Sequence, residues 1–158
     1  MKAKEGVIDY LNQMLTIELT AINQYFVQAA MINNWGYERL GARIRDLSLD
    51  EMRDAERLIN HILYLEGVPN MQRLGQVRVG ENVRECLEAD LESEYNAVRT
   101  LAAAIAHCTQ VGDYTTRNIF EEMIREEEQH IDWFETQLET IRQVGLENYL
   151  TQQIHKDG

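Results

Sequence analysis

The sequence predicts an all-α protein, a bundle of four long helices with one long crossover connection and a short fifth helix. Apolar residues recur at intervals of three and four along four long segments, the pattern of helices that bury one face. A single proline and only nine glycines permit long helices. With 158 residues and 44% hydrophobic content, the chain suits a sizeable core, and we expect a single domain over residues 1–158.

The helices are expected in five segments, at residues 5–34, 37–66, 82–111, 113–143 and 146–155. Tight turns at residues 34–36 and 112–113 make the first and second helices antiparallel, and likewise the third and fourth. Asp113 is suited to cap the start of the fourth helix.

The connection between the second and third helices is longer, and residues 67–81 contain the only proline. About fifteen extended residues reach roughly 50 Å, which exceeds the ~45 Å length of one of these helices. This segment is long enough to return along the bundle, so the second and third helices are expected to run parallel.

Each apolar stripe carries a glutamate where a core residue is expected: Glu18, Glu51, Glu94 and Glu127. All four lie about 15 to 18 residues from the nearest turn, which places them near the middle of the bundle. The same separation of 76 residues relates Glu18 to Glu94, Glu51 to Glu127, and Asp54 to His130. Burying so many unpaired carboxylates would cost more than the ~5 to 15 kcal/mol of net stability of a domain. Something cationic must therefore lie among them.

The spacing of these residues indicates a di-iron site. In di-iron carboxylate bundles two helices supply one glutamate each, and the other two supply a glutamate followed at the third residue by a histidine. Glu127 and His130 have this spacing, whereas Glu51 is followed by Asp54. An aspartate at that position is still a hard oxygen ligand that suits iron.

Composition argues against several classes of partner. A net charge of −12 and a pI near 4.7 argue against nucleic acid, because the phosphate backbone would be repelled. No apolar run is long enough to span a bilayer, and the first residues lack the apolar core of a signal peptide, so we expect a cytoplasmic protein that does not enter a membrane. Cys86 and Cys108 lie on one predicted helix about 33 Å apart and are expected to be reduced thiols.

Several segments resemble bacterioferritin, the haem-containing bacterial branch of the ferritins: AINQYF at 21–26, NWG at 34–36, DEM at 50–52, LEGVPN at 65–70, EEEQHIDW at 126–133 and GLENYL at 145–150. The resemblance implies a ferritin-like four-helix bundle and a hollow homo-oligomeric shell of twenty-four subunits. Such a shell oxidises Fe(II) with O₂ or H₂O₂ at an intrasubunit di-iron centre and stores the Fe(III) product as a mineral.

Carried over by position, the resemblance implies a ferroxidase centre with ligands Glu18, Glu51, Glu94, Glu127 and His130, of which Glu51 and Glu127 bridge the two irons. Asp54 stands where the family has a histidine ligand. Tyr25 matches a tyrosine near the centre. From spacing alone, a core tyrosine with a satisfied hydroxyl is an equally good interpretation.

Met52 follows Glu51 and so points about 100° away from the bundle interior. With Leu19, Phe26, Leu49 and Ile59 it forms a second apolar surface, suited to a subunit interface, where a methionine usually serves packing. The resemblance instead implies that Met52 from each of two subunits ligates one haem b. It also implies a ferredoxin as electron donor for iron release.

Other polar residues leave alternatives open. Asp46 and Asp50 form either an iron-nucleation pair on the shell interior or a solvated acidic face, and the family commonly has a histidine at position 46. The resemblance implies that Asn34, Glu66 and Asp132 line inter-subunit channels. The remaining histidines are expected to face solvent or an interface: His61, His107 and His155.

Three functional classes remain after the sequence analysis. The first is a ferroxidase and iron store. The second is a haem-bearing structural subunit with an impaired centre, which serves in a mixed shell beside a second, competent subunit type. Asp54 and the changed neighbourhood at Asp46 and Leu47 motivate it. The third is another di-iron enzyme on the same bundle. It is the weakest, because the chain has no Cys-x-x-Cys pair to hold an electron-transfer iron.

Overall fold

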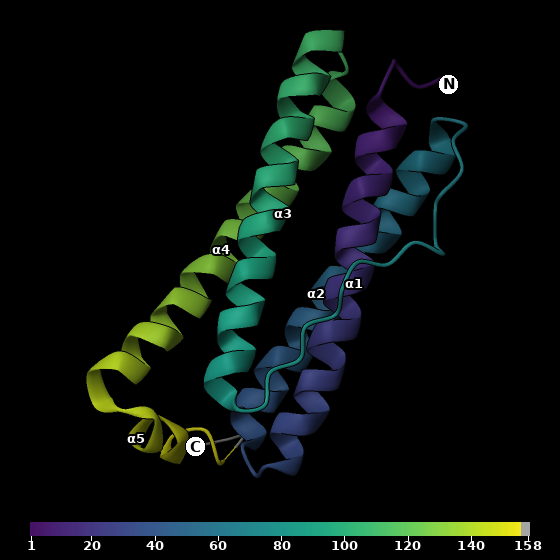
Figure 1. Ribbon diagram of the computed structural model, residues 1–158. Helices are drawn as coiled ribbons and strands as arrows, with labels where there is room; N and C mark the ends of the chain where they lie inside the picture. The colour runs from purple at the N-terminus through teal and green to yellow at the C-terminus, as the bar shows by residue number, and fades with distance from the viewer. Residues whose placement is uncertain (156–158) are drawn as a thin grey trace.

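The computed structural model describes residues 1–155, and over these the protein is all-α, as predicted. The helices are α1 (Val7–Asn34), α2 (Glu38–Tyr64), α3 (Val83–Val111), α4 (Tyr114–Val144) and α5 (Leu146–Thr151) (Figure 1). The four long helices begin and end within about two residues of their predicted bounds. Along the described chain, no helix combines the length and apolarity needed to cross a membrane.

The fifth helix is shorter than predicted, because it ends at Thr151 rather than at residue 155. The backbone N–H groups of Gln152 and Gln153 donate to carbonyls three residues back, which tightens and ends the helix. The Gln153 carbonyl then accepts a hydrogen bond from the Arg39 backbone N–H at 3.0 Å, which ties the end of α5 to the start of α2.

The connections follow the predicted topology. Gly36 and Gly112 have φ of 99° and 75°, a conformation that glycine adopts without strain. Asp113 caps α4 as predicted, accepting a hydrogen bond from the Thr116 backbone N–H at 2.9 Å. The crossover between α2 and α3 runs the length of the bundle beside α1, so α2 and α3 are parallel (Figure 1).

The apolar core has two parts with a polar layer between them. The first cluster includes Leu11, Leu58, Leu101 and Phe120, and the second includes Tyr25, Ile44, Leu87 and Phe134. Between them, at mid-height, are the buried polar side chains of Glu18, Glu51, Asp54, Glu94, Glu127 and His130. The predicted depth of the four glutamates is therefore confirmed.

The prediction for His61 was wrong, because its side chain is 9% exposed rather than facing solvent. Its Nε2 lies 2.8 Å from Thr116 Oγ1, and that hydroxyl donates to Asp113 Oδ2 at 2.6 Å. Burial lowers the pKa of His61. The side chain thus joins the end of α2 to the turn between α3 and α4. His107 is half-buried and bonds to the Glu5 carbonyl at 2.6 Å, whereas His155 is exposed.

Candidate metal centre

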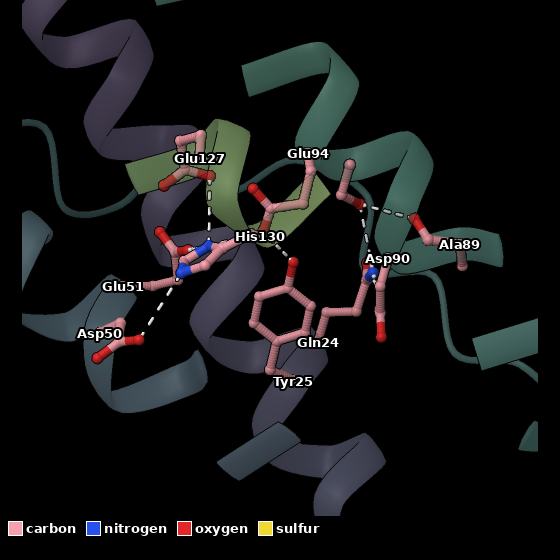
Figure 2. Close-up of polar contacts among 10 residues, drawn as sticks. Gln24, Tyr25, Asp50, Glu51, Ala89, Asp90, Glu94, Glu127 and His130 are labelled. Carbon is pink, nitrogen blue, oxygen red and sulfur yellow. Dashed lines mark hydrogen bonds and ion pairs between the residues drawn. The ribbon is translucent and has the colours of Figure 1, made fainter. Parts of the chain in front are cut away.

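All four long helices contribute acidic side chains to the polar layer. Helix α1 supplies Glu18, α2 supplies Glu51 and Asp54, α3 supplies Glu94, and α4 supplies Glu127 and His130. Figure 2 shows Glu51, Glu94, Glu127 and His130 pointing toward one another from three helices. Since neighbouring helices meet at this height, residues as far apart as 18 and 127 in the sequence share one small volume.

The ligand atoms form two overlapping groups. Glu51, Glu94, Glu127 and His130 each offer one atom, and these atoms lie within 4.8 Å of one another. Glu18, Glu51, Asp54 and Glu127 do the same. Glu51 and Glu127 belong to both groups. The chemistry of the set, carboxylate oxygens with one imidazole nitrogen, suits iron.

Among the described residues of the cluster, His130 is the only side chain that can carry a positive charge. Its Nδ1 lies 3.2 Å from Glu51 Oε1 and 3.5 Å from Glu94 Oε1, and its Nε2 lies 3.7 Å from Asp50 Oδ2. Burial alone would lower the pKa of His130, but the Glu51 and Glu94 carboxylates raise it to about 10. Without metal the imidazole is therefore protonated and partly neutralises the layer.

One imidazolium cannot neutralise five carboxylates, and protonation of some of the carboxylates removes part of the remaining charge. Burial and the neighbouring Glu94 raise the pKa of Glu51 to about 7. Burial and repulsion from Glu51 raise the pKa of Asp54 to about 8, and burial likewise raises that of Glu127. Burial also acts to raise the pKa of Glu94, but its neighbours Glu127, His130 and Tyr25 lower it. The metal-free centre thus holds protons that a cation would displace.

Many buried oxygens of the cluster have no hydrogen-bond partner. They comprise both carboxylate oxygens of Glu18 and of Glu51, Oδ2 of Asp54, Oε2 of Glu94 and Oε1 of Glu127. A buried acceptor without a partner is costly, and native proteins rarely leave one. So many unpaired oxygens in one small volume are compatible with a site where bound metal ions supply the missing contacts.

Asp54 has a neighbour that the sequence analysis missed. The Glu126 and Arg57 side chains are both close enough to Asp54 to affect its pKa. Arg57 itself forms an ion pair with Glu122 of α4. Asp54 therefore lies between the buried centre and a charged group of residues on the α2 and α4 side. Glu126 directly precedes Glu127, a signal that could have pointed to it.

Tyr25 lies at the edge of the centre. Its hydroxyl donates a hydrogen bond to Glu94 Oε1 (Figure 2). Its ring stacks on Phe134 with centroids 6.1 Å apart. Burial and the charge of Glu94 raise the pKa of Tyr25 well above the usual value.

Asp90, one turn before Glu94, is a buried polar residue that the sequence did not reveal. It is fully buried, and Gln24 Nε2 donates to its Oδ1 at 2.8 Å.

The second apolar surface is exposed in the isolated chain. The side chains of Phe26, Leu49 and Met52 are 54%, 37% and 50% exposed, so Met52 points away from the centre, as predicted. Asp50 is partly buried beside His130 and forms an ion pair with Arg53, whereas Asp46 is exposed.

Comparison with known proteins identifies the class to which this fold and site belong. Residues 8–144 match the ferritin-like domain family. The chain is 43% identical to a bacterioferritin of Brucella melitensis over 149 residues, which cover 94% of this chain and 92% of that protein. It is 46% identical to a bacterioferritin of Mycolicibacterium paratuberculosis and 45% identical to bacterioferritin BfrA of Mycobacterium tuberculosis, each over 152 residues and 96% of both chains.

The protein is thus a ferritin-like protein, and within that class the chain belongs to the bacterioferritins. The resemblance found in the sequence motifs is confirmed. Bacterioferritins are iron-storage proteins, and the buried cluster of carboxylates with a histidine is compatible with a metal site.

In the metal-free protein, the stability advantage of Asp54→Asn over wild type should grow as pH rises. In the range from its ordinary pKa of 3.8 to its folded pKa of about 8, Asp54 is ionised when unfolded and neutral when folded. The wild-type free energy of unfolding therefore falls with rising pH, whereas Asn does not titrate. Urea unfolding in the presence of a chelator, at pH values from about 5 to 8, measures the difference between the two proteins.

The exposed Asp46→Asn provides the control, and its difference from wild type should stay flat over the same range. A flat difference for Asp54→Asn as well would show that Asp54 is already ionised in the metal-free protein.

Proposed function

We propose that this protein is a cytoplasmic iron store whose subunits each oxidise Fe²⁺ at an intrasubunit di-iron centre. Glu18, Glu51, Asp54, Glu94, Glu127 and His130 are the proposed ligands. The Fe³⁺ product is stored as a mineral inside a hollow shell of twenty-four subunits, with haem b at the subunit interfaces. A ferredoxin is the proposed electron donor for iron release.

The observation that carries this proposal is the pair of overlapping ligand groups that share Glu51 and Glu127. Two Fe²⁺ ions held there lose one electron each. Dioxygen accepts both electrons with two protons and becomes hydrogen peroxide, or hydrogen peroxide accepts them with two protons and becomes two water molecules. Because carboxylates stabilise the higher charge of Fe³⁺, a centre rich in carboxylates favours the product.

The residues around the centre have separate tasks in this proposal. Glu51 and Glu127 hold both ions, Glu18 and Asp54 hold one, and Glu94 and His130 hold the other. The hydrogen bond from Tyr25 orients Glu94. On binding Fe²⁺, the protonated groups, including His130, release their protons, so affinity for Fe²⁺ should fall as pH falls.

Anaerobic titration should show two Fe²⁺ bound per subunit, followed by rapid oxidation when oxygen is added. Glu127→Ala removes a ligand shared by both ions and should lower Fe²⁺ affinity by roughly 100-fold or more, whereas Asp54→Ala removes a ligand of one ion and should cost roughly 10-fold. Glu128→Ala, at an exposed neighbouring position, is the control and should behave as wild type.

A second candidate function is a haem-bearing structural subunit with an impaired centre in a mixed shell. The neighbouring Glu126 favours it, because Glu126 raises the pKa of Asp54 and so disfavours the ionised carboxylate that would bind iron. In that case the titration should end at one Fe²⁺ per subunit with slow oxidation, and Asp54→His should restore both the second iron and the rate.

Assembly into a shell is the next expectation. Twenty-four copies of an 18.4 kDa chain give a particle of about 440 kDa, which light scattering after size exclusion measures directly. The exposed apolar side chains of Phe26, Leu49 and Met52 need a partner surface of this kind. A stable monomer at micromolar concentration would contradict storage, because storage requires an enclosed volume.

Protein produced with sufficient haem should contain about half an equivalent of low-spin haem per subunit, because one haem is shared by the Met52 side chains of two subunits. Met52→Leu should abolish this absorbance and leave Fe²⁺ binding unchanged. Met71→Leu is a matched control, since Met71 is 51% exposed against 50% for Met52. A spectrum that survives Met52→Leu would exclude Met52 as the ligand.

A further inference from the structure

A cavity of about 360 Å³ lies between α1, α3 and the crossover and extends inward to the carboxylate cluster. Buried residues, including Glu18, Glu51, Glu94 and Glu127, line its inner end. Exposed residues line its rim: Gly75, Gln76, Arg78, Glu92, Asn96 and Arg99. The cavity therefore joins the proposed di-iron centre to the surface of the subunit on the α1 and α3 side.

The crossover forms the roof of this cavity, and side chains of α1 hold it in place. The Gly75 backbone N–H donates to Thr20 Oγ1 at 2.8 Å. The Arg78 backbone N–H donates to Gln24 Oε1 at 3.0 Å, and the Arg78 carbonyl accepts from Gln28 Nε2 at 3.3 Å. Gln24 in turn donates to the buried Asp90, as Figure 2 shows. The Arg78 backbone is thus fixed where the residue lines the rim of the cavity.

The rim is positively charged. It carries the guanidinium groups of Arg78 and Arg99 and the carboxylate of Glu92. Glu92 lies 3.4 Å from Arg99 and offsets its charge, whereas Arg78 forms no ion pair among the described residues. A divalent cation that approaches the cavity from outside meets the charge of Arg78 before it reaches the carboxylates.

The opposite side of the centre, between α2 and α4, has the opposite charge. Glu126 lies beside Asp54, and Asp50 Oδ2 lies 3.7 Å from His130. The arginines on that side, Arg53 and Arg57, each form an ion pair with a carboxylate. With Glu122, three carboxylates stand beside two guanidinium groups there, so a cation is attracted once His130 has released its proton.

We propose that the cavity between α1 and α3 admits the small uncharged oxidant, and that Arg78 and Arg99 exclude Fe²⁺ from it, so that Fe²⁺ reaches the centre from the α2 and α4 side. Coulomb repulsion at the rim acts on Fe²⁺ but not on dioxygen or hydrogen peroxide. Charged rims change the association rates of ions by about 10-fold to 1,000-fold. Arg78 and Arg99 are thus specificity-determining residues. This inference rests on the proposed oxidation of Fe²⁺.

Thiol labelling of the metal-free shell tests the charge selectivity without any oxidation. Ser93 lines the cavity, so Ser93→Cys places a thiol inside it. Cys86 and Cys108 are buried, and burial raises the pKa of each to about 11, which keeps their background reaction slow. The rates of a neutral and a cationic methanethiosulfonate are compared, each relative to its rate with a free thiol.

The neutral reagent should react faster, and adding Arg99→Glu should speed the cationic reagent about tenfold while leaving the neutral one unchanged. Equal rates for the two reagents, or no effect of Arg99→Glu, would overturn the exclusion of cations.

A plug at the rim tests which molecule uses the cavity. Asn96 is exposed and lines the rim, so Asn96→Trp narrows it without disturbing the core. Nitric oxide serves as an uncharged diatomic probe of Fe²⁺-loaded protein, and Co²⁺ serves as a redox-inert cation that binds metal-free protein. Gln110→Trp, exposed on the same helix roughly four turns away, is the control.

Asn96→Trp should slow nitric oxide binding and should leave Co²⁺ binding unchanged. Slower Co²⁺ binding, or an unchanged rate for nitric oxide, would overturn the proposal. Neither probe requires Fe²⁺ oxidation, so failure of the proposed function, seen as a wild-type protein that binds Fe²⁺ but does not oxidise it, is distinguished from failure of this inference.

Discussion

The repulsion among five carboxylates buried at one height is the constraint on which the rest of this structure depends. Burial raises the energy of each ionised carboxylate, and the neighbouring charges raise it further. Protonated His130 and the raised pKa values of Glu51, Asp54 and Glu127 remove most of this charge when no metal is bound. A bound cation would displace these protons, so the polar layer is suited to bind a metal ion.

The two apolar clusters make this layer possible. Each long helix contributes apolar residues above and below its polar residues, so the helices are held together by burial on both sides of the layer. The crossover has two consequences. Its length makes α2 and α3 parallel (Figure 1). Its central residues line the cavity between α1 and α3.

The fold could be predicted closely, because helix periodicity is a local property and the reach of the crossover follows from its length. The depth of Glu18, Glu51, Glu94 and Glu127 followed from their distances to the turns in the same way. Asp113 as a cap was also correct, since a cap depends only on the next few residues.

The contacts between distant helices were harder to predict. Glu126, the neighbour of Asp54, is 72 residues away in the sequence. The two side chains are neighbours only because of the way α2 and α4 face each other in the folded bundle. His61 lies three residues after Leu58 and one before Ile62, both on the buried stripe, so its burial could have been inferred from helix periodicity. Asp90 lies three residues after Leu87 on the buried stripe, but its partner Gln24 belongs to another helix, so their hydrogen bond could not be inferred.

Anomalous diffraction from crystals soaked anaerobically with Fe²⁺ tests the central claim most directly. Two metal peaks per subunit are predicted, both in contact with Glu51 and Glu127, one of them also with Glu18 and Asp54 and the other with Glu94 and His130. A single peak beside Glu94 and His130, with Asp54 turned toward Glu126, would contradict a two-metal centre in this chain.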